Sequence, residues 1–115
     1  MTPENKQKLI SALKNAELAA VAADPGQDAD GGSCNFDKPA IQIPNIRETT
    51  MKKIAEDSGV DLYPFHWMGN KKWYWVRTSS NGQANRRTTM MEAALKILKD
   101  ESPEGVRVQG YYQVD

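Results

Sequence analysis

The chain has 115 residues, and its 15 lysines and arginines balance its 15 aspartates and glutamates to give a formal net charge of zero. A chain of this length fits one domain, and the charge balance excludes a globally basic nucleic-acid-binding protein while allowing a local basic patch. Hydrophobic residues make up 39% of the sequence and cysteine occurs once, so the composition excludes wholesale disorder and a disulfide-stapled scaffold.

The first segment, residues 1–23, is predicted to form a helix. Thr2 is a suitable N-cap, Pro3 suits the first helical position and Glu4 favours the positive end of the helix dipole. Apolar residues recur at helical spacing, at Leu9, Leu13, Ala16 and Ala20. The segment lacks the apolar stretch of a signal peptide, and no run approaches the ~20 apolar residues of a membrane span, so we expect a cytoplasmic protein.

Residues 24–33, with the sequence DPGQDADGGS, are predicted to form a flexible, acidic, glycine-rich linker. They include three aspartates and three glycines but no large apolar residue, so burial gives little to offset the entropy lost on ordering them. We therefore divide the chain into an N-terminal helix (1–23), this linker and a single α+β domain over residues 34–115.

Residues 40–43 are predicted to form a short strand between two prolines, since proline is tolerated mainly at strand ends. A helix is expected to follow, with Asn45 as its N-cap and Glu48 completing a capping box. Gly59 stands where a left-handed residue commonly ends a helix.

The middle of the chain predicts a β-hairpin. Residues 60–68 and 72–78 are rich in aromatic residues, and the turn-forming residues 69–71 lie between them. A polar loop follows over residues 79–85.

A third helix is expected over about residues 86–99. Thr89 and Glu92 form a second capping-box pattern, so a start about four residues later is the alternative. Residues 106–114 are predicted to close the chain as a last strand, with Gly110 as a β-bulge.

After the first helix, these elements follow the order strand, helix, strand, strand, helix, strand. This β-α-β-β-α-β order is that of the split β-α-β, or ferredoxin-like, arrangement. It predicts an α+β fold with an N-terminal helix plus a four-stranded antiparallel sheet carrying two helices on one face. The opposite face is left to solvent, to the first helix or to a partner.

Both faces of the predicted hairpin carry aromatic residues. Side chains alternate along a strand, so Trp73 and Trp75 share one face while Tyr74 lies on the other. Two interpretations stay open for the face with the two tryptophans. The rings lie beneath the first helix, whose Leu9 and Leu13 need a partner surface, or they form an exposed binding surface.

The stretch KKWYWVRT (71–78) is similar to the third strand of the RNA-recognition motif, K/R-G-F/Y-G/A-F-V-x-F/Y, at the first, third, fifth and sixth places. It lacks the glycine, the small fourth residue and the final aromatic residue. IQIPNI (41–46) is similar to that family's first strand, with Gln42 in place of the aromatic residue that stacks a base. The similarity covers about fourteen residues, and we treat it as a structural analogy and not as family membership.

Charge is unevenly distributed along the chain. Residues 62–91 hold five basic residues and no acidic residue, whereas residues 24–37 hold four aspartates and no basic residue. Cations interleaved with aromatic rings are typical of surfaces that bind single-stranded nucleic acid, because bases stack on the rings and phosphates pair with the cations. The candidate residues for binding nucleic acid or another partner are Lys71, Lys72, Trp73, Trp75, Arg77, Arg86 and Arg87.

We therefore expect a small, non-enzymatic binding protein that contacts single-stranded nucleic acid through this aromatic and basic surface. The alternative is a protein-binding module or inhibitor, for example an accessory or anti-defence protein of a phage or mobile element. A third hypothesis is an enzyme centred on a dyad of Cys34 and His66, although no flanking signature supports it. No pair of ligands has the spacing of a metal site, so neither a metal nor a cofactor is predicted.

Overall fold

The computed structural model describes residues 1–29, 36–79 and 84–113. Its elements are α1 (Pro3–Ala22), the short 3-10 helix η1 (Gln27–Ala29), β1 (Lys38–Gln42), α2 (Glu48–Ser58), β2 (Asp61–Trp67), β3 (Lys71–Arg77), α3 (Ala84–Glu101) and β4 (Arg107–Tyr111). The strands form one antiparallel sheet in the order β2-β3-β1-β4. Each of α2 and α3 connects two strands that have a third strand between them, so the predicted fold is confirmed.

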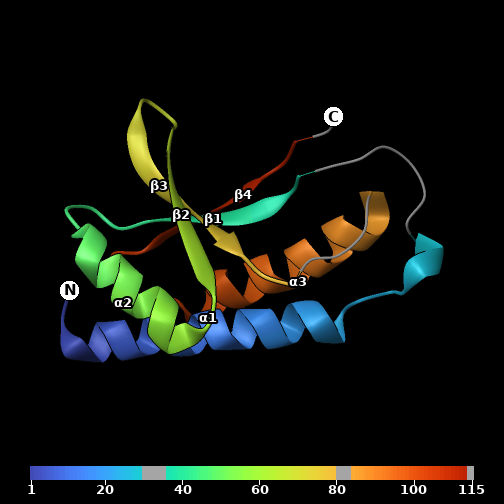
Figure 1. Ribbon diagram of the computed structural model, residues 1–115, viewed down its shortest axis with the longest axis horizontal. Helices are drawn as coiled ribbons and strands as arrows, with labels where there is room; N and C mark the ends of the chain where they lie inside the picture. Colours follow the sequence, from blue (N-terminus) through green and yellow to red (C-terminus); the bar gives the residue numbers. More distant parts are fainter. Residues whose placement is uncertain (30–35, 80–83, 114–115) are drawn as a thin grey trace.

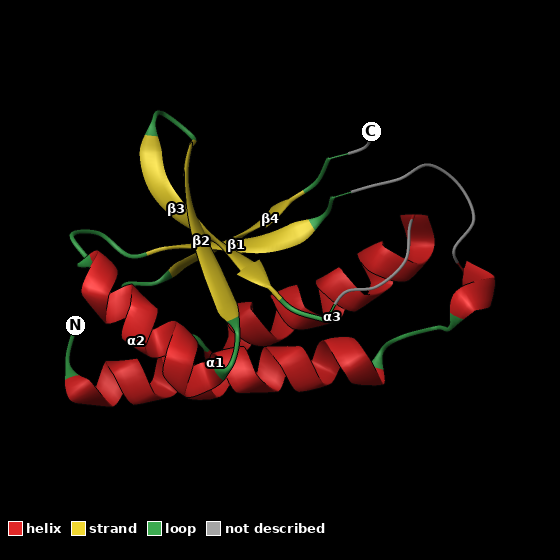
Figure 2. Cartoon of the chain, viewed as in Figure 1, coloured by secondary structure: helices red, strands yellow, loops and turns green. Residues whose placement is uncertain are grey.

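The three long helices lie together on one face of the sheet (Figures 1 and 2). Helix α1 packs along α3 and also contacts α2. Its Leu9 and Leu13 are fully buried in the same core as Ile41 of β1 and Tyr74 and Val76 of β3. The first helix therefore completes the helical layer and does not cover Trp73 and Trp75, which excludes the first of the two interpretations of that face.

Helix α1 begins as the sequence predicts and is fixed at its far end by an ion pair. The Thr2 hydroxyl accepts a hydrogen bond from the backbone N–H of Asn5 at 3.1 Å. Just after the helix, the Asp24 carboxylate accepts bonds from Nε and Nη2 of Arg86 in α3, at 2.9 and 3.0 Å, and from the backbone N–H of Gly26. The described part of the predicted linker, residues 24–29, thus contacts α3, while residues 30–33 lie outside the described residues.

The start of α2 differs from the prediction. Asn45 has a φ of 61° and lies in a turn, and the helix begins three residues later at Glu48. An N-cap residue needs an extended backbone, which the left-handed Asn45 does not have, so the predicted capping box is wrong. The predicted end is confirmed, because Gly59 has a φ of 72° and donates its N–H to the carbonyl of Ala55.

Two further details of the prediction are corrected. Helix α3 runs without a break from Ala84 to Glu101, so a later start at Thr89 is wrong. Gly110 is not a bulge, since it pairs in regular register with Pro39. A Cβ there would lie 2.8 Å from the Tyr112 ring and 3.0 Å from Cδ2 of Leu95, so a larger residue would require these side chains to shift.

The predicted hairpin is confirmed, with its turn shifted by one residue. Trp67 pairs with Lys71, so residues 68–70 connect the two strands. All three have positive φ values, 51° for Met68, 82° for Gly69 and 61° for Asn70. Figure 1 shows the tip of this hairpin projecting away from the helical layer.

If α1 is an integral part of the core, Leu13→Ala is expected to lower the free energy of unfolding by about 2–5 kcal/mol, as for other large-to-small changes in a core. Leu18→Ala in the same helix is the matched control, because Leu18 is 66% exposed and its loss should change stability by less than about 0.5 kcal/mol. Urea denaturation of both variants measures the difference. Equal stabilities for the two variants would contradict this role of α1.

The ion pair after α1 predicts a defined pH dependence. The bond from Arg86, assisted by the Gly26 N–H, lowers the pKa of Asp24 from 3.8 to about 2. Because the folded pKa lies below the unfolded one, the stabilisation is complete above about pH 4 and is lost as the pH falls toward 2. Asp24→Asn should be less stable than the wild type at pH 7 and equally stable near pH 2. A stability gap that persists unchanged at pH 2 would show that the pair does not act in this way.

Candidate nucleic-acid interface

The sheet face opposite the helices is built from residues that pair across the strands. Trp75 in β3 lies between Tyr63 of β2 and Ala40 of β1, and Phe65 pairs with Trp73. Next to them, Lys38 of β1 pairs with Tyr111 of β4. Partners directly opposite each other in a sheet point to the same face, so these side chains share one surface.

Five aromatic rings on this face contact one another, and we call them the aromatic cluster: Phe65, Trp67, Trp73, Trp75 and Tyr111. Phe65 stacks on Trp75 with ring centroids 4.4 Å apart, and Trp67 meets Trp73 edge-on at 5.2 Å. Tyr111 lies 5.9, 5.4 and 5.7 Å from the rings of Phe65, Trp67 and Trp75. These distances are typical of favourable aromatic pairs, so the second face covers itself with its own side chains.

This packing separates the two tryptophans predicted to bind a partner. Trp73 is only 3% exposed, whereas Trp75 is partly exposed at the end of the cluster nearest the start of β1. A buried ring has no free surface on which a base can stack. In this conformation, therefore, Trp73 is inaccessible, whereas Tyr63 is 42% exposed and the four other rings of the aromatic cluster, Trp75 among them, are partly exposed.

Three cations and three carboxylates line an open groove of about 1220 Å³ beside the rings of Tyr63 and Trp75. We call it the basic groove and define it by Lys38, Tyr63, Trp75, Arg77 and Arg87. The Lys38 ammonium lies 4.2 Å from the centroid of the Trp75 ring. The guanidinium of Arg77 lies 6.0 Å from the Tyr63 ring, and its Nη1 donates to the Tyr63 hydroxyl at 3.3 Å.

The cations of the basic groove repel one another. Partial burial lowers the pKa of Lys38, and the positive charges of Arg87 and Arg77 lower it further. Of the three acidic residues that line the groove, Asp61 lies opposite Arg77 on the neighbouring strand, and the other two are engaged internally. Asp37 accepts bonds from the Thr88 hydroxyl and a backbone N–H, and Glu17 accepts from the backbone N–H of Ser79. An anion bound between the cations would relieve their repulsion.

The remaining basic residues predicted from the sequence lie apart from this groove or at its far end. Lys72 lies on the helical side of β3 and donates to Glu48 of α2, which raises the pKa of Lys72 and lowers that of Glu48. Arg86 pairs with Asp24. Lys71 is exposed at the hairpin tip, on the same face as the aromatic cluster. Of the predicted basic residues, only Arg77 and Arg87 line the groove.

Sequence reasoning missed Lys38. The sequence predicts a strand that begins at Ala40 with Pro39 as its boundary, but β1 begins at Lys38. A strand starting two residues earlier would have placed Lys38 on the same face as Ala40, directly beside Trp75. The signal is therefore present in the alternation, but Pro39 argues against a strand because proline has no backbone N–H to donate to a neighbouring strand.

The hypothesis of a catalytic dyad is not tested here, because Cys34 lies outside the described residues. His66 lies in β2, exposed, and pairs with Lys72 on the helical side of the sheet. Within the described ranges, no group of three or more histidines, cysteines, aspartates or glutamates is placed to hold a metal ion.

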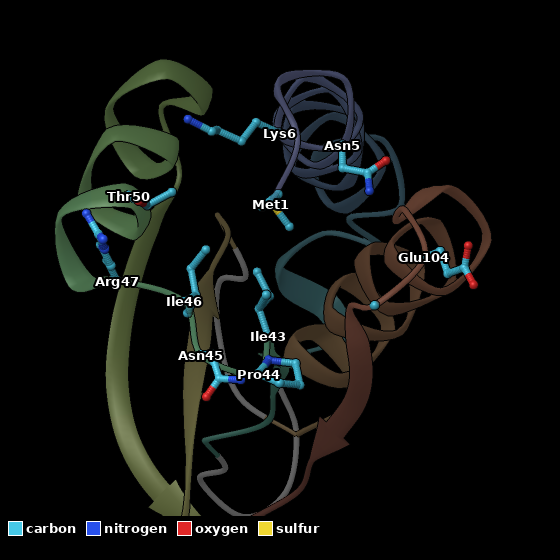
Figure 3. A pocket seen from close by; sticks show the side chains of 11 residues that line it. Met1, Asn5, Lys6, Ile43, Pro44, Asn45, Ile46, Arg47, Thr50 and Glu104 are labelled. Carbon is cyan, nitrogen blue, oxygen red and sulfur yellow. The ribbon is translucent and has the colours of Figure 1, made fainter.

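A second cavity, of about 520 Å³, lies between the start of α1, the β1–α2 loop and the α3–β4 loop (Figure 3). Ile43 and Ile46 extend into it, Lys6 reaches across it toward α2, and Glu104 points away. Its lining contains cations and apolar side chains but no aromatic ring. It therefore offers charge without the stacking surface that the basic groove provides.

Comparison of the chain with protein-family models, curated proteins and solved structures found no match. None of the described helices is both long and apolar enough to cross a bilayer. A function is therefore inferred from the geometry of the sheet face alone.

The crowding of cations predicts that Lys38→Met raises the free energy of unfolding at neutral pH. Methionine keeps apolar contact with Trp75 and removes a charge that burial, Arg87 and Arg77 disfavour. Because the folded pKa of Lys38 is lowered, its destabilising effect is present below that pKa and disappears as the pH rises toward 10.5.

Urea denaturation from pH 7 to about pH 10.5 measures this difference. The gain in stability should shrink with rising pH, and Lys99→Met, which removes an exposed charge in α3, should show no such trend. A Lys38→Met variant less stable than the wild type at pH 7 would contradict the repulsion.

Proposed function

We propose that this protein is a non-enzymatic binding protein that holds single-stranded nucleic acid in the basic groove. The observation that carries the proposal is the position of Lys38 directly over Trp75, with Arg77 and Arg87 near enough to repel it. Folding brings these three cations beside the partly exposed ring of Trp75 and the exposed ring of Tyr63, and a polyanion with planar groups can pair with the cations and stack on a ring. A single strand is such a polyanion, because its bases are unpaired and free to stack.

The two kinds of group in the groove have separate roles in this proposal. Lys38, Arg77 and Arg87 contact phosphates, which supplies affinity without sequence preference. Tyr63 and Trp75 supply ring surface for bases, and each stacked base contributes roughly 1–3 kcal/mol. Tyr63 is pre-positioned for this role, since its hydroxyl accepts a bond from Arg77 and its ring lies beside that guanidinium.

A protein partner with an acidic segment is the competing function. Such a segment would neutralise the same three cations, but it would not place planar bases on Tyr63 and Trp75. The two functions therefore differ in whether the tryptophan emission responds to a single-stranded oligonucleotide.

Titration of the intrinsic tryptophan fluorescence with single-stranded oligonucleotides at several salt concentrations tests the proposal. Three phosphate contacts predict a slope of about −2 in log K against log salt, and Lys38→Met should reduce it to about −1.4. Lys99→Met removes the same charge from the helical layer and should leave the slope unchanged.

An unchanged emission at about 50 mM salt, where phosphate contacts are strong, would refute nucleic-acid binding and favour the protein partner. Equal slopes for Lys38→Met and the wild type would place the contact outside the basic groove.

A further inference from the structure

The aromatic cluster is held closed by a contact between opposite edges of the sheet. β2 and β4 are the two edge strands, so in a flat sheet they would be separated by three strand spacings, about 14 Å. Yet the rings of Trp67 in β2 and Tyr111 in β4 are 5.4 Å apart. The far part of the hairpin therefore bends across the face until it reaches the opposite edge.

The bent part of the hairpin has little support from the rest of the sheet. β3 pairs with β1 at only two positions, Trp75 with Ala40 and Tyr74 with Ile41. Residues 65–73 extend beyond these pairs, and their ladder partners lie within the hairpin itself. A two-stranded ribbon is marginally stable when it stands alone. We call residues 65–73 the hairpin lid.

The closed cluster leaves two strong hydrogen-bond donors without acceptors. The indole Nε1 atoms of Trp73 and Trp75 are both buried, and neither has a partner in the described structure. Buried donors in native proteins almost always have a partner, and an exception requires a specific explanation. In the closed state each indole N–H loses its hydrogen bond to water and gains no other. This loss raises the free energy of the closed state at both tryptophans.

We propose that the hairpin lid opens, and that the indole N–H groups of Trp73 and Trp75 then donate to acceptor atoms on a bound base. This inference rests on the proposed function and adds to it a closed and an open state of the same site. Opening extends the accessible ring surface from Trp75 to Trp73, alongside the cations of the basic groove. Base carbonyl oxygens and ring nitrogens are the acceptors that such donors would recognise.

Tyr111→Ala tests the lid, because it removes the ring contacts from β4 that hold the lid closed. Tyr111→Leu is a second variant that keeps an apolar strand residue and guards against a folding defect. Tyr112→Ala is the matched control, since the neighbouring Tyr112 is 56% exposed. Each is compared with the wild type by NMR, through the hydrogen exchange of the tryptophan indole N–H groups in the absence of oligonucleotide.

The expected result is that both Tyr111 variants speed indole exchange of Trp73 and Trp75 by roughly 5- to 160-fold, the change expected from losing the two aromatic pairs that Tyr111 makes with the lid. The same variants should bind single-stranded oligonucleotides more tightly by a similar factor, while Tyr112→Ala matches the wild type. Indole exchange as slow as global unfolding in every variant would overturn the lid, whatever the oligonucleotide does.

Faster exchange accompanied by unchanged or weaker oligonucleotide binding would overturn the assignment of the two N–H groups as base donors. The exchange measurement uses no ligand. Failure of the lid is therefore distinguishable from failure of the proposed function, in which the wild-type emission itself does not respond.

Discussion

A sheet with all its helices on one side must cover a second face without help from a helix. In this protein the second face carries six aromatic residues, and the sheet solves the problem by curling until Tyr111 on one edge meets Phe65 and Trp67 on the other. Aromatic side chains suit this solution because they are long enough to span the bend and attract one another edge-on and face-on. The degree to which the sheet curls therefore determines which of these rings a partner can reach.

The sheet covers its second face with its own side chains because α1 packs on the other side. Had the first helix packed over the tryptophans, the second face would have become an ordinary core layer. Instead, Leu9 and Leu13 fill the space between α2, α3 and the sheet, and the ion pair between Asp24 and Arg86 holds the end of α1 to α3. The helical layer is thereby complete, and the opposite face is left to the sheet's own side chains.

Charged side chains are also arranged differently on the two sides of the sheet. On the helical side and its rim, cations are paired with acids, as in Lys72 with Glu48 and Arg86 with Asp24. On the open side, Lys38 lies among other cations and over an aromatic ring, and its pKa is lowered. A protein with no net charge thus places three of its cations, together with three carboxylates, beside the rings of Tyr63 and Trp75. Repulsion among these cations opposes folding, which is a common property of sites that bind anions.

The sequence by itself determined the order of the elements, the antiparallel hairpin and the division of the aromatic residues between two faces. Those features depend on local signals, namely periodicity, turn residues and the alternation of a strand. Gly59, for example, was identifiable as a helix end because a left-handed cap is a property of a few neighbouring residues. Tertiary structure alone decided that Asn45 turns instead of capping, that Lys38 reaches Trp75, and that Arg86 and Lys72 are used in ion pairs. It also decided that Trp73 is buried, with its ring against that of Trp67. The ion pairs, the position of Lys38 and the burial of Trp73 are set by contacts between residues far apart in the chain, which local sequence signals do not specify.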